Sequence, residues 1–328
     1  MSELGRILAA IEQHRGTGRP MALATIVATT GSTYRHAGAR LFIPAEGEPI
    51  GNISGGCLED DVARIGGEVM RSQKPRLASF DLSAEEDAVW GYGLGCNGSF
   101  EVFVEPADGA LAVADALRND HGLLTTVISG PDAGTHRFQA GAPGFDTPRM
   151  TEENGSRVLQ EPILPPMRLI VCGAGHDAIP LVRQAAELGW RVTVADVRRT
   201  LLNAERFPDA IAFCDADPDG AAAALQPDAR TAVVLMSHNY LRDIAYLGSF
   251  LGCQLAYLGV LGPRGRTEQM LGELGQPEAL ERLHAPAGLD IGAEGPEEVA
   301  RAIVAEILAV IRRRGGGSLR DRHGSIHG

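Results

Sequence analysis

A strand, a glycine turn and a helix follow one another in the second half of the chain, and this order limits the possible folds sharply. The apolar run Met167–Cys172 leads into Gly173-Ala-Gly175-His-Asp-Ala178, and a helical pattern then continues to Leu188. This is the pattern G-x-G-x-x-A, in which glycines allow a tight turn and bring a phosphate close to the helix N-terminus. Asp196, 21 residues after Gly175, ends the next strand, where such domains place an acid for a ribose hydroxyl. The sequence therefore predicts a Rossmann-type domain with a phosphate-bearing cofactor at this turn.

The rest of the second half alternates strand and helix, which predicts a parallel sheet. Strands are expected at residues 168–172, 191–195, 210–213, 231–236 and 255–260. Ligands bind such sheets beyond the carboxyl ends of the strands. Ser237 and His238 follow the fourth strand, and Arg264 and Arg266 follow the fifth, so these side chains are expected near the glycine turn. Three roles stay open for His238, namely acid/base group, hydrogen-bond donor to a ligand, or structural histidine. Arg264 and Arg266 suit contact with a phosphate, with solvated loop arginines as the alternative.

The length of 328 residues predicts two domains rather than one. We expect an α/β protein with an N-terminal α/β domain built on a mixed sheet at residues 1–165, and a Rossmann-like, doubly wound parallel sheet at residues 166–314. The tail at residues 315–328 is expected to be disordered because it has almost no apolar residues. The proline-rich stretch Glu161–Pro166 is the expected linker.

Composition excludes several classes of protein. The net charge of −12 argues against nucleic acid as the main ligand, and the single lysine, Lys74, leaves no Walker-type or Schiff-base lysine. No apolar run is long enough to span a bilayer, and the N-terminus lacks the features of an export signal. Five scattered cysteines fit reduced thiols better than a disulfide framework. We therefore expect a cytoplasmic protein without membrane contact, and a homodimer on the general frequency of symmetric assemblies.

Two cysteines in the first half stand in glycine-rich turns. Helix is expected at residues 2–15 and strands at 22–29, 40–44, 49–54, 77–82 and 99–105, with a helix and short strands from 110 to 164. Cys57 follows Gly55 and Gly56 and is expected to begin the helix 58–70, whose partial positive charge favours a thiolate. It is therefore a candidate nucleophile, sulfur carrier or soft-metal ligand, with a buried cysteine as the plain alternative.

Cys96 lies in the glycine-dense segment 91–98 and either joins Cys57 or packs in the core. No short spacing of metal ligands connects the two cysteines, so a zinc site is not indicated. Cys172, Cys214 and Cys253 are expected in the core because they lie in or beside predicted strands.

Several separate motifs resemble the XdhC/CoxI family of maturation factors for xanthine and carbon monoxide dehydrogenases. The resemblance covers residues 1 to about 314, and the motifs occur in the family's order. In the first half they are Gly31-Ser-Thr-Tyr-Arg35, Gly38-Ala39-Arg40, Gly51-Asn-Ile-Ser-Gly-Gly-Cys57-Leu-Glu59 and Gly93-Leu-Gly-Cys96. In the second half they are Gly173-Ala-Gly-His-Asp177, Ser237-His238 with Asp243, Tyr257-Leu-Gly259 and His284-Ala-Pro-Ala-Gly-Leu-Asp-Ile-Gly292.

The resemblance implies an accessory chaperone rather than a stand-alone enzyme. Such a protein binds the molybdenum cofactor (molybdopterin), promotes its sulfuration with a cysteine desulfurase, and delivers it to a xanthine dehydrogenase-type hydroxylase. Cys57 and Cys96 are then the residues expected to act on sulfur, with Cys57 also a candidate molybdenum ligand. The residues expected to hold the cofactor, or a nucleotide in the Rossmann domain, are Arg35, Gly55, Gly56, Gly173, Gly175, His176, Asp177, Asp196, Ser237, His238 and Arg264.

The chain departs from the family pattern at three places. Tyr34 replaces a usual proline, Asn97 a common glycine, and Gly262-Pro-Arg264 a Gly-Ser-Arg pattern. Two other functions remain open. One is an NAD(P)-dependent oxidoreductase, with Asp196 on the ribose and His238 as proton donor. The other is a redox or nucleotide sensor in which the cysteines form a reversible bridge.

Overall fold

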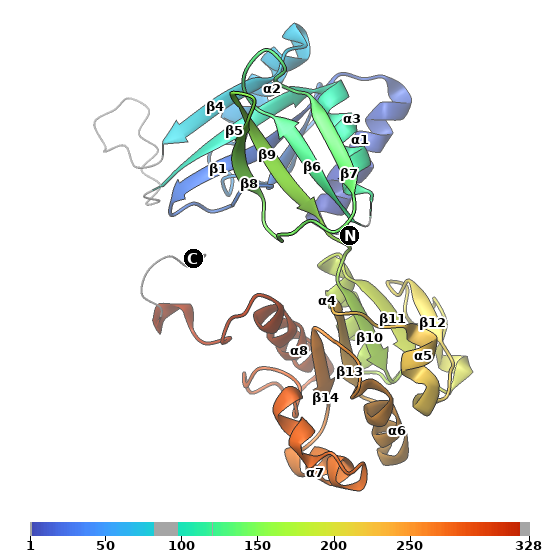
Figure 1. The fold of residues 1–328 in the computed structure, drawn as a ribbon. Helices are drawn as coiled ribbons and strands as arrows, with labels where there is room; N and C mark the ends of the chain where they lie inside the picture. Colours follow the sequence, from blue (N-terminus) through green and yellow to red (C-terminus); the bar gives the residue numbers. More distant parts are fainter. Residues whose placement is uncertain (1, 82–97, 120, 322–328) are drawn as a thin grey trace. The chain divides into compact units, whose positions relative to one another are not determined.

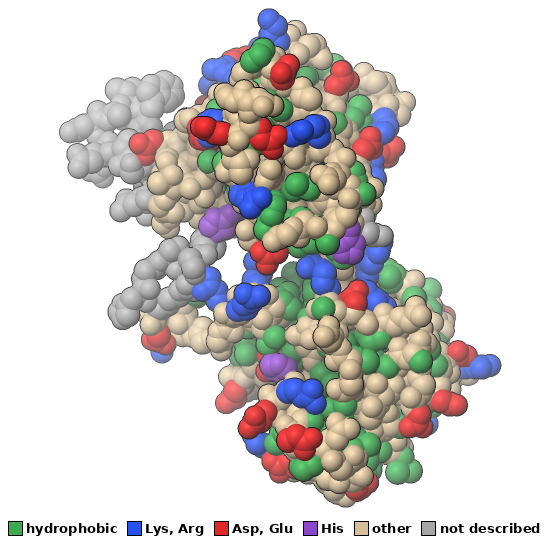
Figure 2. Space-filling view, in the orientation of Figure 1, with side chains coloured by type: hydrophobic (Ala, Val, Ile, Leu, Met, Phe, Trp, Pro, Cys, Tyr) green, Lys and Arg blue, Asp and Glu red, His purple; other side chains and the backbone are tan. Residues whose placement is uncertain are grey.

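The computed structural model describes residues 2–81, 98–119 and 121–321, which form two compact units (Figure 1). Residues 3–165 make the N-terminal unit, and residues 166–321 make the Rossmann unit. On the face drawn in Figure 2, acidic and basic side chains are interspersed over both units. Among the described residues, no helix is both long enough and apolar enough to cross a bilayer.

A five-stranded antiparallel sheet forms the centre of the N-terminal unit, with strand order β3-β2-β1-β5-β4. Residues of β1 alternate between its two faces: Ala22 and Ala24 pack toward helix α2, whereas Met21 and Leu23 pack toward helices α1 and α3. Both faces are therefore covered, which is why residues 21–28 of β1 are apolar apart from the buried Thr25. The elements are α1 (Glu3–Thr17), β1 (Met21–Gly31), β2 (Arg40–Pro44), β3 (Ile50–Gly51), α2 (Glu59–Ser72), β4 (Arg76–Asp81), β5 (Gly98–Pro106) and α3 (Ala107–Leu117).

A second antiparallel sheet, with order β7-β6-β9-β8, completes this unit. It consists of β6 (Gly122–Val127), β7 (His136–Ala140), β8 (Arg149–Glu153) and β9 (Ser156–Ile163). Ile128 and Leu159 pack against Val27 and Phe103 of the first sheet. The expectation of a linker from residue 161 is wrong for residues 161–163, which belong to β9 because they pair with residues 122–124 of β6. Glu161 also forms a buried ion pair with Arg40.

The Rossmann unit is a five-stranded parallel sheet with order β12-β11-β10-β13-β14. Its strands are β10 (Arg168–Cys172), β11 (Arg191–Ala195), β12 (Ala212–Cys214), β13 (Thr231–Leu235) and β14 (Tyr257–Val260). All five lie where the sequence predicted strands, and the α/β class with a doubly wound second half is confirmed. The strand order changes direction between β10 and β13, and such a switch point is where open α/β sheets bind ligands.

Helices cover both faces of this sheet (Figure 1). Leu169 and Val171 of β10 pack toward α4 (Ala178–Glu187) and α8 (Pro296–Ile311), whereas Ile170 and Cys172 pack toward the opposite layer. That layer comprises α5 (Ala221–Leu225), α6 (Tyr240–Phe250) and α7 (Arg264–Glu273). Short 3₁₀ turns lie at Arg199–Leu201, Pro218–Gly220, Pro277–Arg282 and Leu319–Asp321.

Candidate functional site

The glycine turn after β10 is built on a close approach of two backbones. Gly173 has φ +131°, and a Cβ added to it would lie 2.4 Å from the carbonyl oxygen of Met236, at the end of β13. Its amide also donates to the carbonyl of Ala195, at the end of β11 (2.8 Å). Only glycine tolerates this conformation at this distance. The turn is thus held between the ends of the two neighbouring strands.

Asp196 holds the turn from the β11 side. Its side chain is 2% exposed, and it accepts hydrogen bonds from the Ala174 amide (2.8 Å) and from the backbone amide and guanidinium of Arg198 (2.8, 2.9 and 2.6 Å). Burial alone would raise the pKa of Asp196, but these hydrogen bonds outweigh burial and lower it. Both carboxylate oxygens are therefore engaged by the chain, and the group that reaches solvent here is the guanidinium of Arg198, which is 41% exposed.

Asp177 and His238 form a pair over the turn. Nε2 of His238 lies 2.5 Å from Oδ2 of Asp177, and the other oxygen, Oδ1, is buried without a hydrogen-bond partner. The carboxylate folds back so far that a Cβ on Gly175 would lie 2.6 Å from Oδ1. His238 adopts φ +57°, a left-handed conformation that is uncommon outside glycine and often marks a functional position. His176 is exposed beside this pair.

Behind His238, Ser237 belongs to a buried network. Its hydroxyl donates to Oδ1 of Asp243 (2.6 Å), and Nη2 of Arg266 donates to Oδ2 of the same carboxylate (2.6 Å). Asp243 is 1% exposed, so this network fixes the start of α6 against α7. Arg264, the expected phosphate ligand, instead extends into solvent and pairs with Glu268 one helical turn later (2.8 Å).

Two arginines beside the turn were not predicted from the sequence. Nε of Arg206 donates to the carbonyl of Ala174 (3.2 Å), although 32 residues separate them, and no local pattern signals this contact. Arg198 did carry a sequence signal, because it lies two residues after Asp196, which directly follows β11, near where NADP-binding domains place an arginine. Together they make the β11 side of the turn cationic.

The Cys57 loop is organised by Glu59. The carboxylate accepts hydrogen bonds from the backbone amides of four loop residues and from the Ser54 hydroxyl; the amides belong to Ile53 (3.0 Å), Ser54 (2.9 Å), Gly56 (3.0 Å) and Leu58 (3.2 Å). Burial alone would raise the pKa of Glu59, but the hydrogen bonds from Ser54 and Ile53 lower it. The strand expected at 49–54 therefore shrinks to Ile50–Gly51, since the following amides turn toward this carboxylate.

Cys57 itself is a free, exposed thiol. The expectation that it begins the helix is wrong: α2 starts at Glu59, and the Cys57 amide donates to the Ser54 hydroxyl (3.1 Å). The aromatic ring of Tyr34 packs on the same loop, 3.6 Å from where a Cβ on Gly55 would lie. Arg35 is engaged by both carboxylate oxygens of Glu3 (3.0 and 2.7 Å). Cys96 and Asn97 lie outside the described residues.

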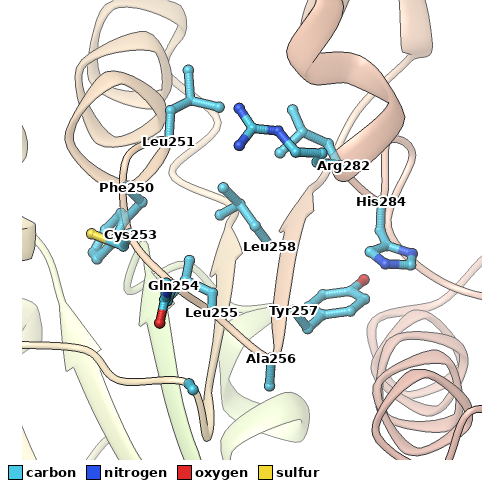
Figure 3. A pocket seen from close by; sticks show the side chains of 12 residues that line it. Phe250, Leu251, Cys253, Gln254, Leu255, Ala256, Tyr257, Leu258, Arg282 and His284 are labelled. Atoms are coloured by element: carbon cyan, nitrogen blue, oxygen red, sulfur yellow. The ribbon is translucent and has the colours of Figure 1, made fainter.

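A separate pocket of about 390 Å³ opens at the other end of the sheet (Figure 3). It is lined by residues that precede or begin β13 and β14, including Ala229 and Leu255, whereas the glycine turn follows the ends of the strands. At its edge the ring of Tyr257 stacks on His284, with centroids 4.4 Å apart, and Glu306 accepts the Tyr257 hydroxyl (2.5 Å). Burial and this hydrogen bond raise the pKa of Tyr257.

Metal ligands do not cluster in the part of the chain that the structure describes: no group of three or more His, Cys, Asp or Glu side chains there is placed to hold an ion. Within the same residues, Cys172 is fully buried in the sheet, and Cys214 and Cys253 are half-buried against the same core, as expected.

Comparisons with known proteins agree across both units. The model of the XdhC Rossmann domain matches residues 169–307, and that of the XdhC and CoxI family matches residues 14–81, which include Cys57. A protein of Bacillus subtilis, named as a probable subunit of xanthine dehydrogenase, is 32% identical over 89% of this chain and 93% of its own length. The molybdenum cofactor insertion chaperone PaoD of Escherichia coli is 26% identical over 90% of this chain and 84% of its own.

A solved structure supports the same relationship. A crystal structure from Bacillus halodurans, described as a xanthine dehydrogenase, matches with a TM-score of 0.79 at 31% identity and covers 97% of this chain and 98% of that one. The similarity therefore includes both the Cys57 loop and the glycine turn.

Proposed function

The chain belongs to the XdhC and CoxI family, and we propose that it is an accessory chaperone that binds the molybdenum cofactor, assists its sulfuration and inserts it into a xanthine dehydrogenase-type hydroxylase. The observation that carries this proposal is that the relationship runs through both units. An alignment at 32% identity over 89% of the chain spans both the unit that bears the exposed Cys57 loop and the unit that bears the glycine turn.

The residues around the glycine turn suit a phosphate-bearing pterin. The turn keeps the tight glycine backbone of a Rossmann domain, because a Cβ at Gly173 would lie 2.4 Å from the Met236 carbonyl oxygen. Arg198 and Arg206 supply positive charge on the β11 side for a phosphate. When bound, the cofactor supplies the molybdenum centre that the hydroxylase uses for its oxidation.

Cys57 is the residue we propose to act on sulfur, and Cys96 is proposed with it. The support for Cys57 is its position: the hydrogen bonds of Glu59 fix the loop while the thiol stays exposed, so a partner protein can reach it. A thiolate is also a soft ligand suited to molybdenum. A cysteine desulfurase as sulfur donor, a cytoplasmic location and a homodimer belong to the same proposal.

Two measurements on purified protein test the role. Fluorescence of an oxidised extract, together with metal analysis, should reveal a bound pterin and molybdenum. The Cys57→Ala variant should lose sulfur transfer or cofactor, while the matched Cys253→Ala variant, altered at a half-buried thiol in the other unit, should behave as the parent does. Full activation of the target hydroxylase by Cys57→Ala would count against the proposal.

One observation favours a second candidate. Arg198 beside Asp196 is an arrangement suited to the 2′-phosphate of NADP, as in an oxidoreductase. Calorimetric titration with NADPH separates the two candidates, because submicromolar binding would favour the oxidoreductase, whereas a chaperone should show weak binding or none.

A further inference from the structure

We propose that the pocket at the amino ends of β13 and β14 binds a small monocarboxylate with an apolar body, such as a medium-chain aliphatic acid or an aryl-substituted acid. The site lies within the Rossmann unit and does not depend on the role proposed above, because the glycine turn follows the opposite ends of the same sheet. Three observations carry the proposal: the size of the cavity, its apolar wall, and an arginine without a partner.

The cavity lies where the chain leaves α6 and enters β14. Its volume of about 390 Å³ falls within the range of about 300–1,000 Å³ that small-molecule sites occupy. Phe250 and Leu251 at the end of α6, and Leu258 of β14, are buried members of the cluster that packs this helical layer on the sheet. Leu255 and Leu283, which are partly buried, continue the same apolar wall. An apolar ligand body would therefore extend the core at this point.

Arg282 gives the cavity its positive charge. It ends the 3₁₀ turn Pro277–Arg282, and in Figure 3 its guanidinium extends from that turn toward Leu251, which lines the cavity from the α6 side. Within the described part of the chain, this guanidinium forms no hydrogen bond or ion pair with a protein group, although Glu281 precedes it directly in the sequence. A guanidinium binds a carboxylate through two parallel hydrogen bonds. The free arginine beside an apolar wall therefore suits a carboxylate head group.

The titratable groups at the edge of the cavity are already engaged by the protein. Nδ1 of His284 lies 3.3 Å from Oε1 of Glu306, and its ring stacks on Tyr257, whose hydroxyl donates to the same carboxylate. The thiol of Cys253 faces the carbonyl oxygen of Ser249 (3.9 Å). One available cation and an apolar wall favour a ligand with a single negative charge over a phosphate or a nucleotide.

Calorimetric titration of the full-length protein at low ionic strength separates the two parts of the ligand. Octanoate carries the charge and the apolar body, octanamide the body alone, and acetate the charge alone; 4-phenylbutyrate and its amide repeat the comparison with an aromatic body. At least one of the two longer acids should bind with a dissociation constant in about the low millimolar range or below, and at least about fivefold more tightly than its amide. Acetate should give no measurable binding.

Two variants test the arginine. Arg282→Gln should bind the preferred acid no more tightly than the amide, with an unchanged melting temperature, because the guanidinium has no protein partner to lose among the described residues. The matched control is Arg301→Gln, altered at an exposed arginine of α8, and it should keep the preference of the parent protein.

The thiol of Cys253 locates the bound acid. Cys253 lines the cavity and is half-buried, so a saturating concentration of the acid should slow its alkylation by iodoacetamide by at least about twofold. Cys57, exposed in the other unit, is the control in the same digest, and its alkylation rate should not change. Binding of neither acid, equal binding of acid and amide, a preference that survives Arg282→Gln, or equal effects on the two thiols would overturn the inference.

Discussion

Replacing Glu161 with glutamine should destabilise the N-terminal unit by about 3–5 kcal/mol, the usual cost of breaking a buried ion pair. Both oxygens of Glu161 accept from Nη2 of Arg40 (2.7 and 2.8 Å), and the two side chains are only 5% and 6% exposed. Nη1 of Arg40 donates to the Gly38 carbonyl (2.8 Å), and its Nε is buried without a partner. The variant therefore leaves a desolvated guanidinium facing a neutral amide.

A neighbouring carboxylate does not remove this cost. Glu105 lies close enough for the charge of Arg40 to act on it, but burial raises the pKa of Glu105, against the lowering effects of its contact with His136 (2.7 Å) and of Arg40. Its charge is thus already opposed by burial and shared with His136. For a unit of this size, 3–5 kcal/mol corresponds to a fall in melting temperature of about 6–20 °C.

Urea denaturation followed by circular dichroism, together with calorimetry, measures the effect. Glu153→Gln is the matched control, because it removes an exposed pair with Arg137 and should cost less than about 1 kcal/mol. The double variant Arg40→Met, Glu161→Leu should recover much of the loss, since no buried charge is then left alone. A cost for Glu161→Gln no larger than that of the control, or a double variant no better than the single one, would refute the reasoning.

Two further predictions concern the turns. The pKa of Glu59 is lowered in the folded protein, so its ionised form stabilises the fold above the ordinary carboxyl pKa of 4.5, and this contribution is lost as the pH falls through the lower folded pKa. Glu59→Gln should therefore flatten the acid dependence of the urea midpoint below about pH 4.5. An unchanged pH dependence of the midpoint would contradict the stabilising role of the hydrogen bonds to Glu59. Gly173→Ala should lower the free energy of unfolding by at least about 2 kcal/mol, because φ is positive and the added Cβ would strike the Met236 carbonyl. The control Gly265→Ala places its Cβ in open space and should not lower it. Equal urea midpoints for the two variants would show that the backbone of the Gly173 turn follows another path.

The strands of the Rossmann unit could be read from the sequence because they are buried on both faces. Arg168–Cys172 and Arg191–Ala195 have the bounds that their apolar runs predict, since each face packs on helices and polar residues are excluded. The strand at 49–54 failed for a different reason. Its composition suits a strand, but the carboxylate of Glu59 accepts hydrogen bonds from the amides of Ile53 and Ser54, which would otherwise pair with a neighbouring strand. A hydrophobic pattern does not reveal that a side chain competes for backbone amides in this way.

The family motifs do not by themselves indicate what each of their residues does in the fold. Gly38-Ala39-Arg40 is a family motif to which the sequence assigned no role, and in the structure Arg40 is buried against Glu161, while a Cβ on Gly38 would lie 3.1 Å from Pro148. These residues join the two sheets of the N-terminal unit. Arg206 shows the opposite case: it reaches the glycine turn, but nothing in its local sequence distinguishes it, because the contact depends on how the chain returns after β11.

Both glycine turns that the sequence offered to an external anion have a carboxylate of the chain beside them. The amides before α2, which were expected to favour a Cys57 thiolate, hydrogen-bond to Glu59 and Ser54. The turn before α4, expected to receive a phosphate, is covered by Asp177. In each case the acid lies within a few residues of the glycines, and acidic residues near a helix start also stabilise that helix, so the sequence alone does not distinguish an open site from a filled one. It follows that an anionic ligand at either turn would meet a carboxylate of the chain, which opposes its binding by charge repulsion.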